Sequence, residues 1–594
     1  MVRPAPETRR VRASTLGAMS GFDVDAARAA LEARHPTWVP RSLHATLEDV
    51  AGEHPARPFV IAVDGELSYA DLDAWSRRIA RGIVAAGVAP GDRVALLLPN
   101  SAAFVAAVFA ISRAAAIAVP LHSRLHEREL AFALRDSGAT LLLTVEAFRD
   151  APIGENLDAL APGWHRGGGG PSIPSLRSVV LCAGVWRVTR PGATTLEDFE
   201  RDPDPALDAE LDARSRAVAP DDPATVLYTS GTTGPAKGVV LTHDMELRSA
   251  YGSAYTRAFE DGRRILFALP LHHVFAYVEG LLASLFVGGA VVCQPVFDPE
   301  EALAAIERHG VAEALFVPTM SLAVVEAAAA RTYDLSSLHA VMSAAAVCPA
   351  RLWRQLIDRL VVTELVTGYG MTETSAATTF TMPGDPVDVM VETVGRPKLG
   401  GVAGDPGLGG LLARYETIDP VTAEPLPAGE PGELVVSGPI ITHGYREAPE
   451  ENRNAFDALG RLRSGDLGRV RPDGYLELTG RTRDLYRCGA ESVMPAEVEG
   501  VLAERDDVEQ AHVVPVPDER MGEVGCAFVV PAPGAKPAEE ELIAYCRAQL
   551  SRYKVPAHVV LCAASDLPLT ASGKVQKFVL AERATAVLGL GTAA

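Results

Sequence analysis

Basic residues are scarce in this sequence relative to acidic ones. Its 594 residues include 55 Lys and Arg against 76 Asp and Glu, which gives a formal net charge of −21 at pH 7. Nucleic-acid binders and anionic-membrane binders both depend on basic surface. A general binder of either kind is therefore not the class that this composition predicts.

Cysteines are few and scattered along the chain. None of the seven forms a Cys-x-x-Cys pair or has a His-rich neighbour, so neither a disulfide framework nor a zinc site is expected. This usage favours a reducing compartment, and we expect a cytoplasmic protein. The cysteines are Cys182, Cys293, Cys348, Cys488, Cys526, Cys546 and Cys562.

Uninterrupted hydrophobic runs are also lacking. Two uncharged stretches, residues 94–112 and 280–297, approach the ~20 residues that a spanning helix needs, but Pro99 breaks the first and Gly288 and Pro295 break the second. Both stretches are expected to be core, and no transmembrane segment is predicted.

The first 41 residues show no regular apolar pattern, and the arginines near the N-terminus are not followed by a hydrophobic segment of signal-peptide type. We therefore predict a loose N-terminal extension over residues 1–41.

From Ser42 onward, apolar spacing typical of helices alternates with short apolar runs typical of buried strands. This alternation predicts an α/β fold, with mainly parallel sheets covered by helices and a β-rich portion at residues 394–478. Residues 162–175 are expected to form a mobile surface loop. A large domain is predicted over residues 42–482 and a small α+β domain over residues 483–594.

A run of small and hydroxylated residues between two apolar segments is the most informative motif. It extends from Tyr228 to Gly238. Glycines accept conformations that a Cβ would forbid, hydroxyls donate to oxygens, and a Lys ammonium offsets anionic charge, so the run predicts a turn that binds a polyphosphate such as that of ATP. Its Lys is not followed by Ser or Thr as in a Walker loop, which argues against a P-loop kinase or motor. The predicted contacts are Thr229, Ser230, Gly231, Thr232, Thr233, Gly234 and Lys237.

This run resembles the phosphate loop of the adenylate-forming (AMP-binding) enzymes, and five further segments resemble that family's motifs in the same order. Residues 366–374 are similar to the adenine-binding turn, in which an aromatic residue stacks on the base. The resemblance implies that Glu373, together with Thr229, binds Mg²⁺, which prefers carboxylate and phosphate oxygens. The nucleotide contacts expected in the turn are Gly368, Tyr369, Gly370, Met371 and Thr372.

Other matches lie toward the C-terminus. Asp466 resembles the carboxylate that accepts hydrogen bonds from both ribose hydroxyls, and Arg481 resembles the arginine placed against ribose and phosphate. Lys574 matches the family's catalytic lysine, whose fixed ammonium would stabilise the negative charge of the transition state. Leu569 stands where the family usually has Arg.

The same resemblance implies a moving C-terminal domain. Arg483 occupies the hinge position, where the family normally has Asp or Lys. Gly489 lies in a segment similar to the loop that helps to form the thiol tunnel of acyl-CoA synthetases. The domain would turn about the hinge to present Lys574 for adenylation and the Gly489 loop for thioester formation.

Residues 269–280 resemble the family's acyl-pocket segment, with His273 at the position that often gates the carboxylate. Amino-acid-activating domains usually have an Asp nearby, whereas residues 274–276 are Val-Phe-Ala, so an α-amino acid is disfavoured. Small residues suggest a roomy apolar pocket for a fatty, aryl or alicyclic acid. The predicted substrate residues are His273, Val278, Gly280, Ala344, Ala345 and Ala346.

These features predict an ATP- and Mg²⁺-dependent acyl-CoA synthetase that makes acyl-AMP and then a coenzyme A thioester, with Lys574, Glu373 and His273 as catalytic residues. Four alternatives stay open: loading of a separate acyl carrier protein, an enzyme for one half-reaction, a luciferase-like oxygenase, and a non-catalytic nucleotide-binding relative. The last is opposed by the presence of four family residues, which are Lys237, Glu373, Asp466 and Lys574. Both a monomer and an oligomer fit the sequence.

Overall fold

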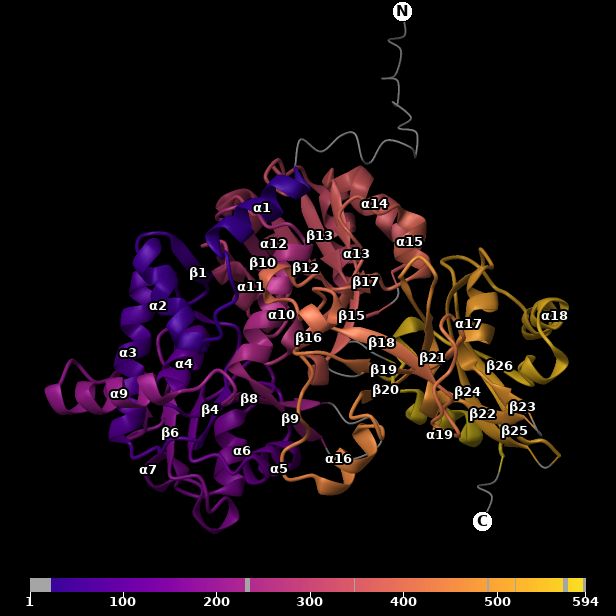
Figure 1. Cartoon of the computed structure of the whole chain (residues 1–594). Helices are drawn as coiled ribbons and strands as arrows, with labels where there is room; N and C mark the ends of the chain where they lie inside the picture. The colour runs from indigo at the N-terminus through magenta and orange to yellow at the C-terminus, as the bar shows by residue number, and fades with distance from the viewer. Residues whose placement is uncertain are drawn as a thin grey trace, which may run out of the picture. The chain divides into compact units, whose positions relative to one another are not determined.

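The structure is a computed structural model that describes residues 23–229, 236–346, 348–488, 491–518, 520–569 and 575–590. The chain packs into two compact units (Figure 1). Unit 1 contains the described residues of Met1–Thr229, Ala236–Arg414 and Gly438–Pro449, and unit 2 contains those of Tyr415–Ser437 and Glu450–Ala594. The predicted domain boundary at Arg483 lies inside unit 2 and stays a prediction.

Unit 1 contains two seven-stranded sheets. The first has the order β14-β13-β12-β10-β11-β1-β2 and is parallel except for β2. Its parallel strands are short, mainly apolar runs buried on both faces, as parallel strands covered by helices must be. They are β1 (Pro58–Ala62), β10 (Arg264–Phe267), β11 (Ala290–Cys293), β12 (Glu313–Phe316), β13 (Ala340–Ser343) and β14 (Glu364–Val366). The antiparallel edge strand is β2 (Gly65–Ser68), which is partly exposed. Helices α12 (Pro299–His309), α13 (Pro318–Ala330), α14 (Ala350–Leu360) and α15 (Val387–Glu392) belong to this half.

The second sheet has the order β7-β6-β5-β3-β4-β8-β9 and is parallel except for the β8–β9 hairpin. Its strands are β3 (Arg93–Leu97), β4 (Ile117–Pro120), β5 (Leu141–Thr144), β6 (Ser178–Leu181), β7 (Thr194–Thr195), β8 (Pro223–Thr229) and β9 (Lys237–Thr242). Its helices include α2 (Leu43–Glu53), α3 (Tyr69–Ala85), α4 (Ala102–Arg113), α5 (Glu127–Ser137), α6 (Ile153–Leu160), α8 (Leu196–Phe199) and α9 (Pro205–Ala217). The predicted α/β class with mainly parallel sheets is confirmed.

Helix α4 is the centre of this half of unit 1. The Ser101 side chain caps it by accepting a hydrogen bond from the Phe104 amide. All twelve of its residues are buried, which is expected for a helix that is apolar on every side. Figure 1 shows α2, α3 and α4 beside one another, and each packs against the other two. The uncharged stretch at residues 94–112 is therefore core, as predicted.

Two segments that were expected to be irregular are ordered. Helix α1 (Val24–Arg34) lies inside the predicted loose extension, and Arg28 in it donates hydrogen bonds to the carbonyls of Tyr255 and Thr256. Helix α7 (Trp164–Gly167) lies in the predicted mobile loop, with the Trp164 side chain in the core. Both expectations are wrong for these residues, because contacts with distant residues hold α1 and burial of Trp164 holds α7, although neither segment shows apolar periodicity.

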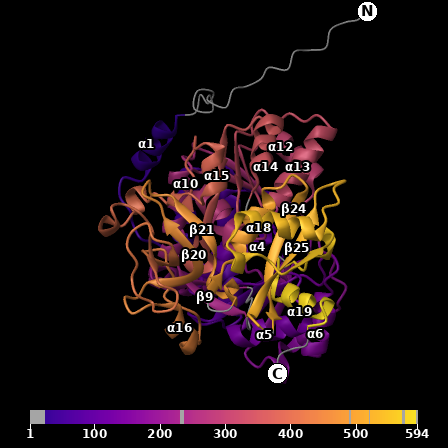
Figure 2. The same cartoon turned by 90° about the vertical axis from the view of Figure 1, so that its right-hand side faces the viewer.

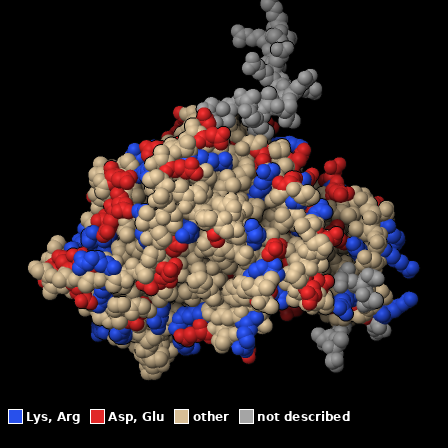
Figure 3. Space-filling model, viewed as in Figure 1, with Lys and Arg blue, Asp and Glu red and all other residues tan. Residues whose placement is uncertain are grey.

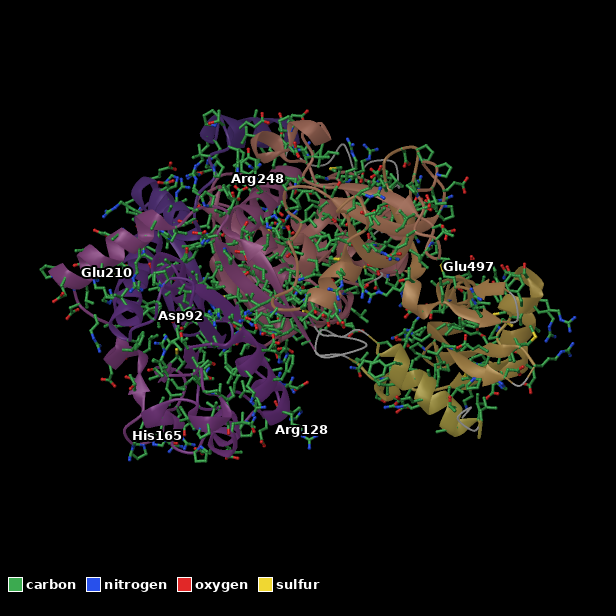
Figure 4. All side chains as sticks on the ribbon, turned by 60° about the horizontal axis from the view of Figure 1, so that its bottom comes forward. Asp92, Arg128, His165, Glu210, Arg248 and Glu497 are labelled. Atoms are coloured by element: carbon green, nitrogen blue, oxygen red, sulfur yellow. The ribbon has the colours of Figure 1, made fainter. Side chains whose placement is uncertain are left out.

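The rest of unit 1 joins the two sheets. It contains α10 (His243–Thr256), the π-helix η3 (Phe275–Leu282) and an antiparallel sheet of β15 (Gly368–Met371), β16 (Ala376–Phe380) and β17 (Arg396–Pro397). The glycine-rich segment of residues 398–412 packs on α10. Arg248 of α10, labelled in Figure 4, donates to the Ala403 carbonyl at 2.6 Å.

Unit 2 contains two more sheets. One has the order β18-β19-β20-β21 and the other β23-β22-β25-β24, with β26 beside β25. Figure 2 shows β24 and β25 as adjacent strands, and α17 and α19 pack on β24. Helices α17 (Pro495–Ala503) and α18 (Glu539–Gln549) lie in the region where the sequence predicts a small α+β domain. The remaining elements are β18 (Arg414–Ile418), β19 (Gly432–Ser437), β20 (Leu462–Val470), β21 (Leu476–Arg481), β22 (Tyr486–Cys488), β23 (Glu491–Val493), β24 (Val508–Asp518), β25 (Gly522–Pro531), β26 (His558–Leu561), α16 (Pro449–Ala455) and α19 (Lys577–Val587).

Candidate active site

The β8–β9 hairpin carries the predicted phosphate loop at its turn. Strand β8 ends at Thr229 and β9 begins at Lys237, and these two residues are register partners. The hairpin therefore places both predicted contacts at the base of the turn. The other predicted contacts, Ser230, Gly231, Thr232, Thr233 and Gly234, lie outside the described residues.

Tyr445 connects two residues that the sequence assigned to the phosphates and the metal. Its hydroxyl donates to Glu373 Oε1 at 2.8 Å, and Lys237 Nζ lies 5.1 Å from the centroid of its ring. Backbone pairing holds Tyr445 there, because Gly444 accepts from the Val240 amide and Arg446 donates to the Gly238 carbonyl. Glu373 and Lys237 thus meet beside the hairpin. No sequence motif pointed to Tyr445, since the contact links segments about 70 and 200 residues apart in the chain.

The predicted adenine turn is an antiparallel pair of strands. A Cβ on Gly368 would lie 2.6 Å from the Thr379 carbonyl oxygen, and one on Gly370 would lie 1.9 Å from that of Ala376. The two glycines are therefore required by the close approach of β16 itself. Tyr369, which is half-buried, stands between them on β15.

The end of this turn bends sharply. Met371 is the last residue of β15, and Thr372 and Glu373 form the short 3₁₀-helix η4 (Thr372–Thr374). The Thr374 side chain accepts from the Met371 amide at 3.0 Å. Ser375 and Ala376 follow with φ of +52° and +88°, a region that non-glycine residues rarely adopt. The backbone carbonyl of Glu373 also accepts from the Thr442 amide at 2.8 Å, which fixes the residue between two contacts.

The residues around the hairpin suit a Mg²⁺ ion whose ligands are mostly phosphate oxygens. No group of three acidic, His or Cys side chains that could hold a metal occurs among the described residues. Glu373, a half-buried carboxylate, lies beside the phosphate hairpin through its contact with Tyr445. This donor set suits Mg²⁺, which is commonly bound by one or two carboxylates together with substrate phosphates.

The second half of the predicted acyl segment belongs to the π-helix η3 (Phe275–Leu282). This helical form is rare overall but frequent at functional sites. His273 is exposed just before η3, and its Nδ1 accepts from the Phe275 amide at 3.3 Å. Val278 has no exposed surface. A Cβ on Gly280 would lie 2.8 Å from the Phe267 ring and 3.2 Å from Leu315. Gly280 therefore permits close packing of η3 on β10 and β12, and on that side it opens no room for a substrate, contrary to expectation.

The predicted alanine wall follows strand β13. Ala344 is buried, whereas Ala345 and Ala346 are exposed, and Ala345 has a φ of +71°. The segments after β10, β13 and β14 carry residues 269–273, 344–346 and 368–371. Since these strands are parallel, all three segments leave the same edge of the sheet. Ligands of open α/β sheets bind at this carboxyl edge.

In unit 2, the two predicted ribose residues form a pair. Asp466 on β20 and Arg481 on β21 are register partners, and Arg481 Nε lies 2.9 Å from Asp466 Oδ1. The Asp466 side chain is 9% exposed and that of Arg481 is 40% exposed. An antiparallel pairing thus brings together two residues that the sequence could only name separately.

Three predicted residues of unit 2 remain, and the structure describes one of them, Arg483. Arg483 lies in the short 3₁₀-helix η7 (Thr482–Asp484), between β21 and β22. Gly489 and Lys574 lie outside the described residues. Lys577, three positions after Lys574, pairs with Glu499 at 2.6 Å and lies 3.8 Å from Asp484. The roles of these residues stay predictions.

A buried carboxyl group that the sequence did not reveal lies behind the acyl segment. Glu246 on α10 accepts hydrogen bonds from the hydroxyls of Thr225 and Tyr277, the latter at 3.2 Å. Burial raises the pKa of Glu246 to about 8, although both hydrogen bonds oppose the shift. The carboxyl group is therefore largely protonated at neutral pH.

One face of the molecule can be inspected for a basic patch. On the face shown in Figure 3, acidic and basic side chains are interspersed. None of the helices in the described part of the chain combines the length and the apolar character that a membrane crossing requires.

The chain belongs to the AMP-binding enzyme family. The family model "AMP-binding enzyme" matches residues 47–446, and the model "AMP-binding enzyme C-terminal domain" matches residues 497–574. Within this class of adenylate-forming enzymes, the protein is an acyl-CoA synthetase, an AMP-forming acid–thiol ligase. It uses ATP, Mg²⁺ and coenzyme A. The predictions of family, enzyme class and cofactors are confirmed.

Three similar proteins illustrate the relationship. The chain is 35% identical over 542 residues, or 90% of its length and 98% of the relative's, to the 3-[(3aS,4S,7aS)-7a-methyl-1,5-dioxo-octahydro-1H-inden-4-yl]propanoyl:CoA ligase of Mycobacterium tuberculosis. It is 36% identical over 511 residues to the feruloyl-CoA synthase of an Amycolatopsis species, which covers 86% of this chain and 92% of the relative. The O-succinylbenzoate coenzyme A synthetase of Bacillus subtilis in complex with AMP superposes with a TM-score of 0.70 at 27% identity, covering 90% of this chain and 97% of that one.

Proposed function

We propose that this synthetase activates a hydrophobic fatty, aryl or alicyclic carboxylic acid. The observation that carries the proposal is the meeting of Lys237 and Glu373 at Tyr445 beside the phosphate hairpin. The apolar and buried helix η3 supports a hydrophobic acyl group. The similar ligases also act, by their names, on an alicyclic propanoate and on an aryl acid.

In the first half-reaction, a carboxylate oxygen of the acid attacks the α-phosphorus of ATP. The bond from that phosphorus to the oxygen bridging to the β-phosphate breaks, and pyrophosphate leaves with the electron pair. Lys237 and the loop after Thr229 bind the polyphosphate, and Glu373 holds Mg²⁺, which offsets phosphate charge. Lys574 stabilises the negative charge that develops between the carboxylate and the α-phosphate.

The nucleotide and the acid have their own contacts in this proposal. Tyr369 stacks on the adenine, with Met371 and Thr372 beside it, and Asp466 and Arg481 bind the ribose. His273 stands where it would gate the carboxylate.

In the second half-reaction, the sulfur of coenzyme A attacks the acyl carbonyl carbon, the thiol proton is released, and AMP leaves. Gly489 belongs to the segment proposed to contact the thiol arm, and Arg483 is the proposed hinge. We also propose a reducing cytoplasm, which is supported by seven free thiols, six of them buried.

A panel of fatty, aryl and alicyclic acids with magnesium-ATP tests the proposal, with pyrophosphate and AMP measured in the presence and absence of coenzyme A. A hydrophobic acid should release both products and form a CoA thioester. Pyrophosphate release without acylation of CoA would indicate that a carrier protein accepts the acyl group in the second step. A preference for amino acids or for small polar acids would refute the proposed substrate class.

A further inference from the structure

The glycine-rich segment 398–412 inserts a lysine into the interior of unit 1. The Lys398 side chain is 0% exposed. Its aliphatic part passes over Gly252 of α10, where a Cβ would lie 2.9 Å from Lys398 Cδ. Beside it, the Leu399 amide donates to the Thr256 hydroxyl at 3.0 Å. The segment is thus docked on α10 by several contacts, and Lys398 is its most deeply buried charge.

The ammonium of Lys398 has a complete set of partners. It donates to the hydroxyls of Ser249 and Ser253, both at 2.9 Å, and to Glu279 Oε1 of η3 at 3.2 Å. Burial lowers the pKa of Lys398 to about 8, and Glu279 opposes the shift. The group therefore stays largely charged at neutral pH, and the ion pair joins the glycine-rich segment to helix η3.

The same partners hold the backbone that follows Glu373. The Ser249 hydroxyl, which accepts from Lys398, donates to the Ser375 carbonyl at 2.6 Å. The Ala377 amide donates to Glu279 Oε1 at 3.0 Å. Ser375, which makes the first contact, and Ala376, which lies between the two contacts, have the positive φ values described above. Such conformations persist only where surrounding contacts hold them.

We propose that Lys398 is a positioning residue, which holds the turn after Glu373 through Ser249 and Glu279 and so fixes the metal-binding carboxylate beside the phosphate hairpin. The assignment of Glu373 to Mg²⁺ rests on the proposed function. The Lys398–Glu279 pair also connects η3 to this turn, because Glu279 Oε1 accepts from both Lys398 and the Ala377 amide.

A role in stability alone explains this arrangement poorly. A buried ion pair contributes little net stability compared with apolar residues of similar volume, whereas loss of one partner leaves a costly unpaired charge. Glu279 has a second cationic neighbour, Arg257, with 3.6 Å between Nη2 and Oε2. Replacement of Lys398 therefore removes the link to Ser249 and the turn without leaving Glu279 wholly uncompensated.

The test compares Lys398→Met, which keeps an unbranched side chain, with Arg113→Met. Arg113 is an equally buried cation, but its partners Glu48 and Asp73 lie on α2 and α3. Amide hydrogen exchange is measured on the full chain without ligand, for peptides covering residues 372–380, together with the Tm. We expect Lys398→Met to speed exchange in these peptides about tenfold, and Arg113→Met to change exchange there no more than elsewhere.

Adenylation kinetics supply the second readout. Lys398→Met should raise the Mg²⁺ concentration needed for half-maximal rate and lower kcat about tenfold, with the KM for the acid unchanged. The double variant Lys398→Met/Glu279→Gln should recover part of the rate, because the Gln carbonyl can still accept from Ala377 and no charge is left unpaired.

The outcomes separate this proposal from the proposed function. The positioning role would be overturned if Lys398→Met matched Arg113→Met in both measurements, the amide exchange of residues 372–380 and the Mg²⁺ dependence of adenylation. A wild-type protein that adenylates no acid would instead refute the proposed function, and the exchange comparison would then decide by itself whether Lys398 holds the turn.

Discussion

Tyr445 shows how single residues shape this site. It contacts Glu373 through its hydroxyl and Lys237 through its ring. One side chain therefore contacts both a carboxylate and a cation that we expect to lie near the phosphates. In unit 2, Asp466 and Arg481 are similarly paired across two strands. In each case the charged group has a protein partner, which holds its orientation before any ligand binds.

Glu246 leads to a prediction about pH. The folded protein keeps a proton on Glu246 up to a pKa of about 8, whereas the unfolded chain releases it near its ordinary pKa of ~4.3. The resulting stability is fully present below the unfolded pKa and is lost as pH rises through about 8. The isosteric Glu246→Gln does not ionise. From about pH 5 to about pH 8, the free energy of unfolding of the wild type should therefore fall by up to ~1.4 kcal/mol per pH unit relative to that of the variant. Thermal unfolding of both proteins across this range checks the trend, and parallel Tm curves would contradict it.

Lys574 gives the sharpest catalytic prediction. Lys574→Ala should reduce adenylation about a thousandfold, or ~3–4 kcal/mol, because a fixed donor to the charge of the transition state is lost. Lys577→Ala is the matched control, since the Lys577 ammonium already pairs with Glu499. Its adenylation rate should stay within a few-fold of the wild type. Equal losses in the two variants, measured as pyrophosphate release, would show that the effect is structural.

At the scale of elements, the β15–β16 pair sets the shape of the nucleotide turn. Gly370→Ala would place a Cβ 1.9 Å from the Ala376 carbonyl oxygen, and relief of such a clash typically costs ~1–3 kcal/mol. We expect a lower Tm and weaker AMP binding, measured by differential scanning fluorimetry and calorimetry.

Gly52→Ala serves as the control for this substitution. Gly52 lies in α2 with nothing within 4 Å of its Cβ position, so alanine there should be neutral or stabilising by ~0.5–1 kcal/mol. Unchanged Tm and AMP affinity in Gly370→Ala would mean that β16 can move away, and that the glycine is not needed for the turn.

For the whole molecule, nucleotide binding should raise stability by mass action. At about 100 times the Kd, AMP or magnesium-ATP should add ~2.7 kcal/mol to the free energy of unfolding and raise the Tm. If Glu373 holds Mg²⁺ against the phosphates, EDTA should reduce the shift caused by ATP and leave that caused by AMP. An ATP shift insensitive to EDTA would count against Glu373 as the metal ligand.

Much of this protein is determined by local sequence. Apolar alternation predicted the α/β class, and the glycine-rich run predicted a turn between two buried strands, because residue spacing and turn chemistry act over a few neighbours. The ordered motifs identified the family and its activity. They named Glu373, Asp466 and Arg481 individually, but they did not indicate which side chains meet.

The tertiary structure decided the contacts between distant segments. It packed α1 onto α10 through Arg28, brought Tyr445 between Glu373 and Lys237, and closed the space beside Gly280 that composition had suggested was free. It also placed Lys398 against Glu279, 119 residues away in the chain. Such contacts depend on how whole sheets and helices pack, and a local pattern of residues contains no information about that packing.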